Sequence, residues 1–178
     1  MTEIKIRNAT LDDAPRLVEI YSYYVEKTAI SFEYEVPSVE KFQVRMVRTQ
    51  KKYPYLVAEL NGKIAGYAYA KSFIEREAYK FSAELTIYLD KNFRKQGVGG
   101  KLYSQLEKNL REIGITNLYT CVGYPEVEDE YLTLNSVHFH EHCGYRICGK
   151  FTNCGYKFNR RYSMVWMEKI IGGKNESD

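Results

Sequence analysis

The 178-residue sequence predicts one domain of mixed α/β (α+β) architecture, in which about four helices flank a central mixed sheet of about seven strands. Strand-like and helical hydrophobic patterns follow one another in the order β-α-α-β-β-β-α-β-α-β-β. Asn61–Gly62, the strongest two-residue hairpin signal, joins two of the strands and predicts antiparallel pairing. A glycine-rich turn at 94–101 connects another strand directly to a helix, which indicates a crossover connection.

The N-terminal third of the chain predicts one strand and two helices. Charged and apolar residues alternate at 4–6, as they do in a short half-buried strand. A capping-box pattern at Thr10 opens a helix that ends near Lys27, with apolar residues at helical spacing between them. After a loop, Ser38 is placed to be the N-cap of a second helix over 39–51.

The middle of the chain predicts a hairpin, a further strand and a long helix. Strand-like segments at 55–60 and 63–70 flank the hairpin turn. The strand at 83–89 directs alternate side chains to opposite faces, with Leu85, Ile87 and Leu89 on one face and Glu84, Thr86 and Tyr88 on the other. The glycine-rich turn then opens a helix over 99–113, which a glycine ends.

The C-terminal third predicts three strands and a short helix. A β-prone run at 118–122 forms the next strand. A helix over 135–142 stops at a glycine. The last two strands are expected near 145–150 and 164–170, which completes the sheet.

Composition places the chain among ordinary globular proteins. The net charge is 26 − 23 = +3, which is not the profile of a dedicated nucleic-acid binder. No apolar run is long enough for a transmembrane helix, and the N-terminal residues lack a signal-peptide core, so we expect a cytoplasmic protein. The domain is expected over 1–171, followed by a flexible polar tail at 172–178. The 17 tyrosines suit a polar-lined cleft or an interface.

The cysteines and histidines show no recognisable metal-ligand spacing. HExxH and CxxC are absent, and the adjacent His142 and Cys143 are awkwardly placed to share a zinc ion with His138. We therefore expect no metal. In a cytoplasmic protein the cysteines are expected to be reduced and to act as small buried hydrophobic side chains: Cys121, Cys143, Cys148 and Cys154.

The glycine-rich turn carries the most specific local pattern. Its glycines permit positive φ angles and present bare N–H groups at a helix N-terminus, where the dipole and basic side chains favour an anion. The pattern differs from the P-loop and from the dinucleotide fingerprint. A pyrophosphate cradle and a basic turn with a glycine N-cap are the two interpretations. The residues concerned are Arg94, Lys95, Gln96, Gly97, Val98, Gly99 and Gly100.

The spacing Arg94–x–x–Gly97–x–Gly99 resembles the acetyl-coenzyme A (acetyl-CoA) loop of the GNAT (general control non-repressible 5-related N-acetyltransferase) family. The order of strands and helices matches that fold along nearly the whole chain. Eight further segments resemble the phosphinothricin acetyltransferase-like branch, and together they are more specific than any one of them. They are 28–33, 53–59, 65–68, 78–79, 84–89, 139–141, 144–145 and 155–157.

The resemblance implies acetyl-CoA as the co-substrate. In the family the pantetheine arm pairs with the strand before the loop, which here is Ile87, Tyr88 and Leu89, and the pyrophosphate lies on the loop. A backbone N–H near Tyr88 would donate to the oxyanion. Relatives contact the cofactor with an Asn where this chain has Thr133, so Asn135, which follows an acidic insertion, is expected to make that contact.

The resemblance also implies roles for two catalytic side chains. Glu84 stands at the position of a general base that acts through water, and its alternative is a solvent-facing strand charge. His140 stands where many relatives carry a tyrosine acid and where this branch carries histidine. Its imidazole could assist either proton transfer, and the alternative is a hydrogen-bonded, partly buried histidine.

The acceptor site is implied by four further positions. Phe32 would provide an apolar wall, Arg76 and Tyr79 would hold an anionic group, and Lys157 would add a cation. Ile74 stands where phosphinothricin acetyltransferases carry a lysine. The alternative for Arg76 is an ion pair with a neighbouring glutamate on a solvated loop.

These features predict an acetyl-CoA-dependent N-acetyltransferase that acts on a small amino-acid-like amine, of the phosphinothricin or methionine sulfoximine/sulfone type. Two alternatives stay open: acetylation of a protein or peptide amine, and a non-catalytic module of the same fold that senses acyl-CoA or binds nucleic acid. The pair of Glu84 and His140 argues against a sensor, and the small net charge argues against nucleic acid. We expect no nucleic-acid or membrane partner. Because members of this branch are commonly dimers, a homodimer is the candidate assembly.

Overall fold

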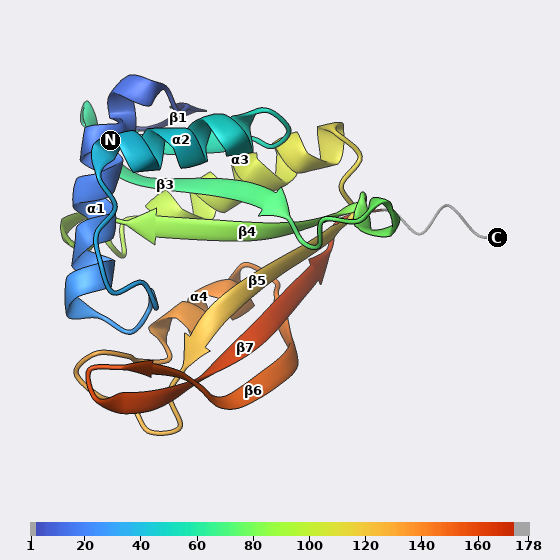
Figure 1. The fold of residues 1–178 in the computed structure, drawn as a ribbon. Helices are drawn as coiled ribbons and strands as arrows, with labels where there is room; N and C mark the ends of the chain where they lie inside the picture. The colour runs from blue at the N-terminus through green and yellow to red at the C-terminus, as the bar shows by residue number, and fades with distance from the viewer. Residues whose placement is uncertain (1–2, 173–178) are drawn as a thin grey trace.

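The computed structural model describes residues 3–172 as seven strands in one sheet with helices on both faces (Figure 1). The strand order is β1-β2-β3-β4-β5-β7-β6. The strands are β1 (Ile4–Asn8), β2 (Tyr55–Leu60), β3 (Lys63–Ser72), β4 (Ser82–Leu89), β5 (Asn117–Tyr124), β6 (Arg146–Lys157) and β7 (Arg160–Ile170). The helices are α1 (Ala14–Lys27), α2 (Val39–Gln50), α3 (Val98–Glu112) and α4 (Asn135–His142). The predicted fold class and element order are therefore confirmed.

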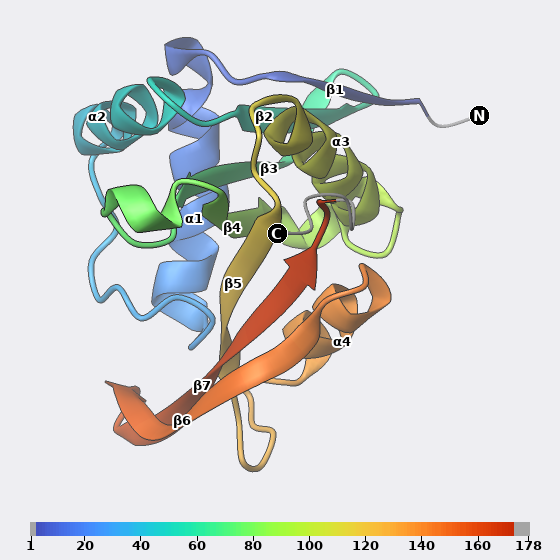
Figure 2. The same ribbon diagram turned by 90° about the vertical axis from the view of Figure 1, so that its right-hand side faces the viewer.

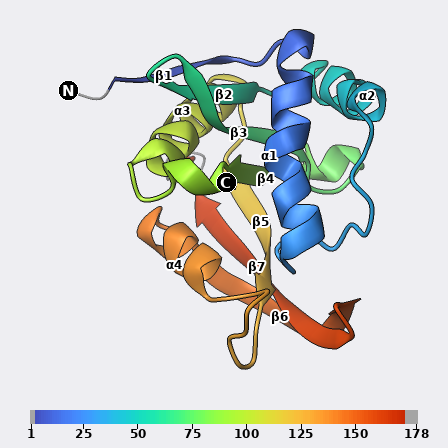
Figure 3. The same ribbon diagram turned by 90° about the vertical axis from the view of Figure 1, so that its left-hand side faces the viewer.

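The helices divide between the two faces of the sheet, α1 and α2 on one and α3 and α4 on the other (Figures 2 and 3). Each face has its own apolar core. Strand β4 alternates as predicted, because Leu85 packs in the α3 core and Tyr88 packs against the α1 core. The capping signals also hold, since the Ser38 hydroxyl accepts a hydrogen bond from the Lys41 amide at the start of α2.

Strands β4 and β5 are the only parallel neighbours among the described strands, and they pair over a short stretch. Three residue pairs join them, from Ser82 with Asn117 to Glu84 with Tyr119. Each strand is eight residues long, so most of each one has no partner on this side. Figure 1 shows the two strands separating like the arms of a V. The separation opens a gap in the middle of the sheet.

The structure differs from the sequence-based expectation in two respects, the length of the last hairpin and the exposure of the cysteines. Strands β6 and β7 extend to a tight turn at Phe158 and Asn159, whose φ angles of 50° and 59° are the left-handed values of a hairpin turn. The sequence lacks the usual glycine there, so this extension was not predicted. The cysteines are also not buried: Cys121, Cys148 and Cys154 are exposed, Cys143 is half-buried, and all four are free thiols.

Residues 173–178, most of the predicted tail, lie outside the described residues. Within residues 3–172, no helix is both long enough and apolar enough to cross a membrane.

Candidate active site

A cleft begins in the gap between β4 and β5 and continues onto the face of the sheet that α2 covers. Its first part, the gap cavity, has a volume of about 240 Å³ and is lined by β4, β5 and α4. Its second part, the tyrosine pocket, has a volume of about 480 Å³ and lies between α2 and strands β2 to β4. The two parts share the lining residues Tyr21, Glu33, Tyr69, Lys71 and Tyr88.

Glu84 lies in the gap cavity at the last residue pair before β4 and β5 separate. Its carboxylate is 15% exposed, and its Oε1 is 3.1 Å from the Nζ of Lys71 on β3. A carboxylate that is held by one lysine and still reached by solvent can accept a proton from a nearby amine or water. The predicted base therefore lines the gap cavity, beside a lysine that lines both parts of the cleft.

The free backbone groups of β4 point into the gap. The Asp90 amide donates to the Ala65 carbonyl on β3, whereas the amide and carbonyl of Leu89 both meet the hydroxyl of Tyr24 on the opposite side. Because amides alternate along a strand, Ile87 directs its N–H and C=O to the same side as Leu89. That side is the gap. Of the two amides on this side next to Tyr88, that of Leu89 is bonded to Tyr24, and that of Ile87 points into the gap.

The glycine-rich turn forms the N-terminus of α3. Lys95 and Gly97 have φ angles of 60° and 80°, and the amides of 98–100 belong to the first helical turn, where no helical carbonyl precedes them. The Arg94 guanidinium lies 5.4 Å from the ring centroids of Tyr23 and Tyr24 on α1. This is an anion-binding arrangement of amides, a helix dipole and a basic side chain.

The glycines of this turn differ in their surroundings. A Cβ on Gly99 would come within 2.9 Å of the Phe139 ring and 3.2 Å of the Leu89 side chain. A Cβ on Gly100 would meet no atom within 4 Å, and the space beside it is open. Gly99 thus allows the close packing of α3 on α4 and β4, whereas Gly100 faces open space.

His140 is a buried, fully hydrogen-bonded imidazole. Its Nδ1 lies 2.6 Å from the Ser136 carbonyl, which can only accept, so Nδ1 carries the hydrogen. Its Nε2, 2.9 Å from the Tyr103 hydroxyl, then accepts from that group. Burial lowers the pKa of His140 to about 4. The imidazole is therefore neutral at pH 7, which favours the hydrogen-bonded alternative over a cationic acid.

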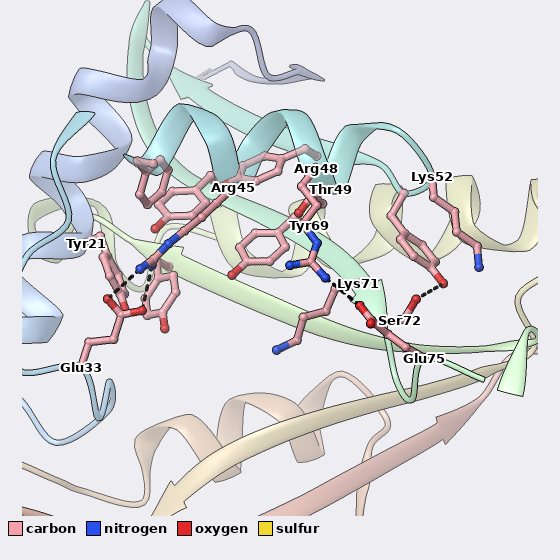
Figure 4. A pocket seen from close by; sticks show the side chains of 15 residues that line it. Tyr21, Glu33, Arg45, Arg48, Thr49, Lys52, Tyr69, Lys71, Ser72 and Glu75 are labelled. Atoms are coloured by element: carbon pink, nitrogen blue, oxygen red, sulfur yellow. Dashed lines mark hydrogen bonds and ion pairs between the residues drawn. The ribbon is translucent and has the colours of Figure 1, made fainter. Parts of the chain in front are cut away.

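The tyrosine pocket contains residues that sequence analysis did not single out (Figure 4). The rings of Tyr55 and Tyr69 stack at 4.7 Å, and burial raises the pKa of Tyr67 and Tyr88, so these hydroxyls keep their protons. Arg45 and Arg48 project from α2 above the rings. Nothing local in the sequence of α2 marks these arginines, because their role depends on where the helix packs. The high number of tyrosines in the sequence was the one feature that indicated such a pocket.

Both arginines are held by carboxylates. Arg45 Nη1 is 2.8 Å from Glu33 Oε1, and Arg48 Nη2 is 2.9 Å from Glu75 Oε1 (Figure 4). Lys71 pairs with Glu84 in the adjoining gap cavity. The cations of the pocket are therefore paired with carboxylates of the protein. A carboxylate or phosphinate of a ligand can replace one of these partners.

The structure places Arg76 and Tyr79 at the edge of the cleft and not inside it. Both are exposed on the loop between β3 and β4 and line a shallow hollow that adjoins the tyrosine pocket. Within residues 3–172, Arg76 forms no ion pair, because Glu75 pairs with Arg48 and Glu77 pairs with Lys80. The loop thus leaves the Arg76 guanidinium accessible to an acceptor.

Neither Phe32 nor Lys157 lines the gap cavity or the tyrosine pocket. Phe32 packs against Tyr162 with ring centroids 6.4 Å apart, and its ring closely covers Gly155. The Lys157 ammonium is buried and donates to three backbone carbonyls at 2.6–2.8 Å. All three of its N–H donors are used, which leaves none for an acceptor.

Asn135 is the first residue of α4, and its side chain is exposed. Its amide donates to the Thr133 hydroxyl at 3.4 Å, so Thr133 acts on the helix start. The acidic insertion before it is tied down, since Asp129 and Glu130 both pair with Arg160. Within residues 3–172, no three side chains of the His, Cys, Asp and Glu types gather as a metal site would require.

Comparisons with known proteins agree with this geometry. Residues 6–166 match the family model described as an acetyltransferase (GNAT) domain. The phosphinothricin N-acetyltransferase of Streptomyces viridochromogenes is 32% identical over 154 residues, which cover 86% of this chain and 80% of that protein. The L-methionine sulfoximine/L-methionine sulfone acetyltransferase of Salmonella typhimurium is 25% identical over 164 residues, which cover 92% of each chain.

A solved structure extends the likeness to the whole fold. The GNAT superfamily phosphinothricin acetyltransferase from Sinorhizobium meliloti, in complex with acetyl-CoA, superposes with a TM-score of 0.88 at 28% identity. The match covers 98% of this chain and 92% of that chain. The family model alone spans most of the sequence. The chain therefore belongs to the GNAT family of acetyl-CoA-dependent N-acetyltransferases, in its phosphinothricin acetyltransferase-like branch.

Proposed function

We propose that this enzyme transfers the acetyl group of acetyl-CoA to the primary amine of a small amino-acid-like acceptor, of the phosphinothricin or methionine sulfoximine/sulfone type. The observation that carries the proposal is the position of Glu84. Its carboxylate lines the gap cavity where β4 and β5 separate, and it pairs with Lys71, which lines both cavities. The names of the relatives from Streptomyces viridochromogenes and Salmonella typhimurium support this acceptor class.

Acetyl-CoA would bind with its pyrophosphate on the turn at 94–100 and its pantetheine arm along β4. The amides at the start of α3 support the first placement, and the unpaired Ile87 N–H and C=O support the second. The thioester carbonyl would then accept a hydrogen bond from the Ile87 amide, which stabilises the oxyanion that forms during attack. Asn135, exposed at the start of α4, remains the proposed contact from that loop.

Glu84 would remove one proton from the acceptor ammonium through a bridging water. Glu84 and Ile87 are three residues apart, about 10 Å along a strand, which leaves room for both amine and water. The free amine attacks the thioester carbon, the tetrahedral intermediate expels the thiolate, and the second nitrogen proton neutralises that thiolate. His140 would take part as a neutral imidazole that lines the cavity with Ser136 and is held by the buried Tyr103 hydroxyl behind it.

The acceptor's anionic group would bind the cations of the tyrosine pocket. Lys71 lines both cavities, and Arg45 contacts the shared lining through its partner Glu33. Arg76 and Tyr79, on the accessible loop, are proposed to contact the outer end of the acceptor. With Ile74 in place of a lysine, we expect phosphinothricin itself to be a weaker substrate than a simple α-amino acid analogue.

The deciding experiment measures free-thiol release from acetyl-CoA with a panel of amines. The panel contains phosphinothricin, methionine sulfoximine, methionine sulfone, polyamines and an amino-terminal peptide. We expect the amino-acid-like compounds to give the highest kcat/KM. A preference for the peptide would support protein acetylation instead. Binding of acetyl-CoA with no turnover of any amine would support a sensor.

A further inference from the structure

Lys157 at the end of β6 carries a buried charge that the proposed chemistry does not use. The residue is 3% exposed, and its Nζ donates to the carbonyls of Val25, Thr28 and Ser31 at 2.7, 2.8 and 2.6 Å. Within residues 3–172, no carboxylate forms an ion pair with it. A buried ammonium without a counter-ion is costly, so three short hydrogen bonds must offset its loss of hydration.

The C-terminus of α1 explains why this site tolerates a cation. Val25 lies in the last turn of α1, whose final carbonyls have no helical donor and form the negative end of the helix dipole. Thr28 and Ser31 add two carbonyls from the chain that follows. Burial lowers the pKa of Lys157, and the Glu33 charge opposes that change. The three oxygens thus form a cage that an ammonium group fills.

The caged segment leads directly into the cleft. We call residues 28–33 the cleft segment. Its Ile30 lines the gap cavity, and its Glu33 lines both cavities and pairs with Arg45 at 2.8 Å. Its Ser31 hydroxyl lies 2.7 Å from the hydroxyl of Tyr21, another shared lining residue. The segment contains no helix or strand, and one backbone hydrogen bond, from the Ala29 amide to the Tyr131 carbonyl, holds it together with its side-chain bonds.

We propose that Lys157 is a positioning residue, which fixes the cleft segment and thereby sets the acceptor side of the active site. It acts through the backbone of 28–31 and touches neither substrate. The inference rests on the proposed function, because it assigns the cleft segment to the acceptor. It predicts that loss of the ammonium group harms acceptor binding and leaves acetyl-CoA binding intact, since the turn at 94–100 lies on other elements.

The test compares Lys157→Met with Lys150→Met. Methionine keeps most of the length and apolar volume of lysine and removes the charge and the donors. Lys150 is another β6 lysine, exposed and paired with Glu126 at the surface, so its replacement controls for loss of a charge on this strand. Each variant is measured by amide hydrogen exchange, by acceptor KM and kcat, and by calorimetric titration with acetyl-CoA.

We expect Lys157→Met to speed amide exchange in 29–33 by about tenfold or more, while the amides of α3 exchange as in the wild type. Acceptor KM should rise by about tenfold with little change in kcat, which is the pattern of lost binding. The Kd for acetyl-CoA and all properties of Lys150→Met should stay unchanged. Lys157→Gln, which keeps a shorter neutral donor, should lie between Lys157→Met and the wild type.

Two results would overturn the proposal. One is wild-type exchange in 29–33 of Lys157→Met. The other is faster exchange that is equal in 29–33 and in α3, which would mean a general loss of stability. If Lys157→Met does not fold, the same criteria apply to Lys157→Gln. The exchange measurement involves no acetyl transfer, so failure of the proposed acceptor class and failure of this inference are separate outcomes.

Discussion

At the scale of single residues, we expect Glu84 to determine how fast the acceptor amine is deprotonated. Replacement by glutamine keeps the shape and the hydrogen bonding to Lys71 and removes the basicity. An α-ammonium group is mostly protonated at pH 7, so we expect kcat to fall by about 10²–10⁴ for Glu84→Gln. The loss should shrink as the pH rises and free amine accumulates. A pH–rate profile from pH 6 to 10 measures this, and near wild-type turnover at pH 7 would leave Glu84 without a role as base.

His140 makes stability depend on pH. Its folded pKa of about 4 lies below the ordinary value of 6.5, so the unfolded chain binds a proton between these values and the folded chain does not. Stability is therefore complete above pH 6.5 and falls as the pH drops towards 4, by about 3 kcal/mol in total. Urea unfolding from pH 4 to 7.5 measures the slope. His140→Gln should flatten it, and an unchanged slope in that variant would place its origin elsewhere.

The sequence predicted some site residues and missed others for one physical reason. Glu84 could be predicted because an acid inside a β-prone strand is a local signal, and β4 carries it to the gap. Arg45 and Arg48 could not be predicted as pocket residues, because charged residues on a helix usually face solvent. Only the packing of α2 over the sheet places these two above a pocket. Lys157 matched a position in a family pattern, and only the fold shows that its ammonium group turns inward.

At the scale of elements, the two glycines at the start of α3 allow a test of ligand binding that is separate from a test of packing. Gly100→Val adds a side chain to open space. Because valine has a helix propensity no lower than that of glycine, the fold should be retained. If the pyrophosphate approaches there, the Kd for acetyl-CoA should weaken by about tenfold, or about 1.4 kcal/mol. Calorimetry measures this. Gly99→Val is the contrasting variant, because its clash with Phe139 should lower the melting temperature. Unchanged affinity in Gly100→Val would move the pyrophosphate elsewhere.

Elements with strong local signals were predicted within a few residues, and the long hairpin was not. Strand β2 coincides with its predicted range of 55–60, because apolar residues and a glycine turn define it. Strand β6 is exposed along most of its length, so it lacks the apolar alternation that reveals a strand. Its length is set by pairing with β7, which is a long-range property.

At the scale of the whole molecule, binding in the gap should stabilise the fold. After Glu84, none of the described strands pairs with β4 on the β5 side. The pantetheine arm of acetyl-CoA would supply the missing hydrogen bonds. Acetyl-CoA at about 100 times its Kd should add about 2.7 kcal/mol to the free energy of unfolding. The melting temperature should then rise by roughly 5–10 °C, measured by scanning calorimetry. Pantetheine, which lacks the pyrophosphate, should give a smaller rise at equal concentration. No rise with acetyl-CoA would contradict binding in the gap.

The β6 edge of the sheet is the candidate surface for self-association. Strand β6 is a 12-residue edge strand, with Ile147, Phe151 and Tyr156 exposed along it. Long apolar edges are usually covered, so we expect a homodimer through this region. Sedimentation velocity at micromolar concentration measures the assembly. Phe151→Lys should yield monomers, whereas Val44→Lys, which alters an exposed apolar residue on α2, should not. A monomeric wild-type chain would contradict this expectation.

The cage around Lys157 also bears on the order in which the chain folds. It joins atoms that lie 126–132 residues apart in sequence. A ribosome therefore releases α1 and the cleft segment more than 120 residues before it releases their ammonium partner. Helices and the β2–β3 hairpin can form from local contacts before then. The cage cannot form until Lys157 has been made, so the cleft segment lacks this tie until β6 is complete.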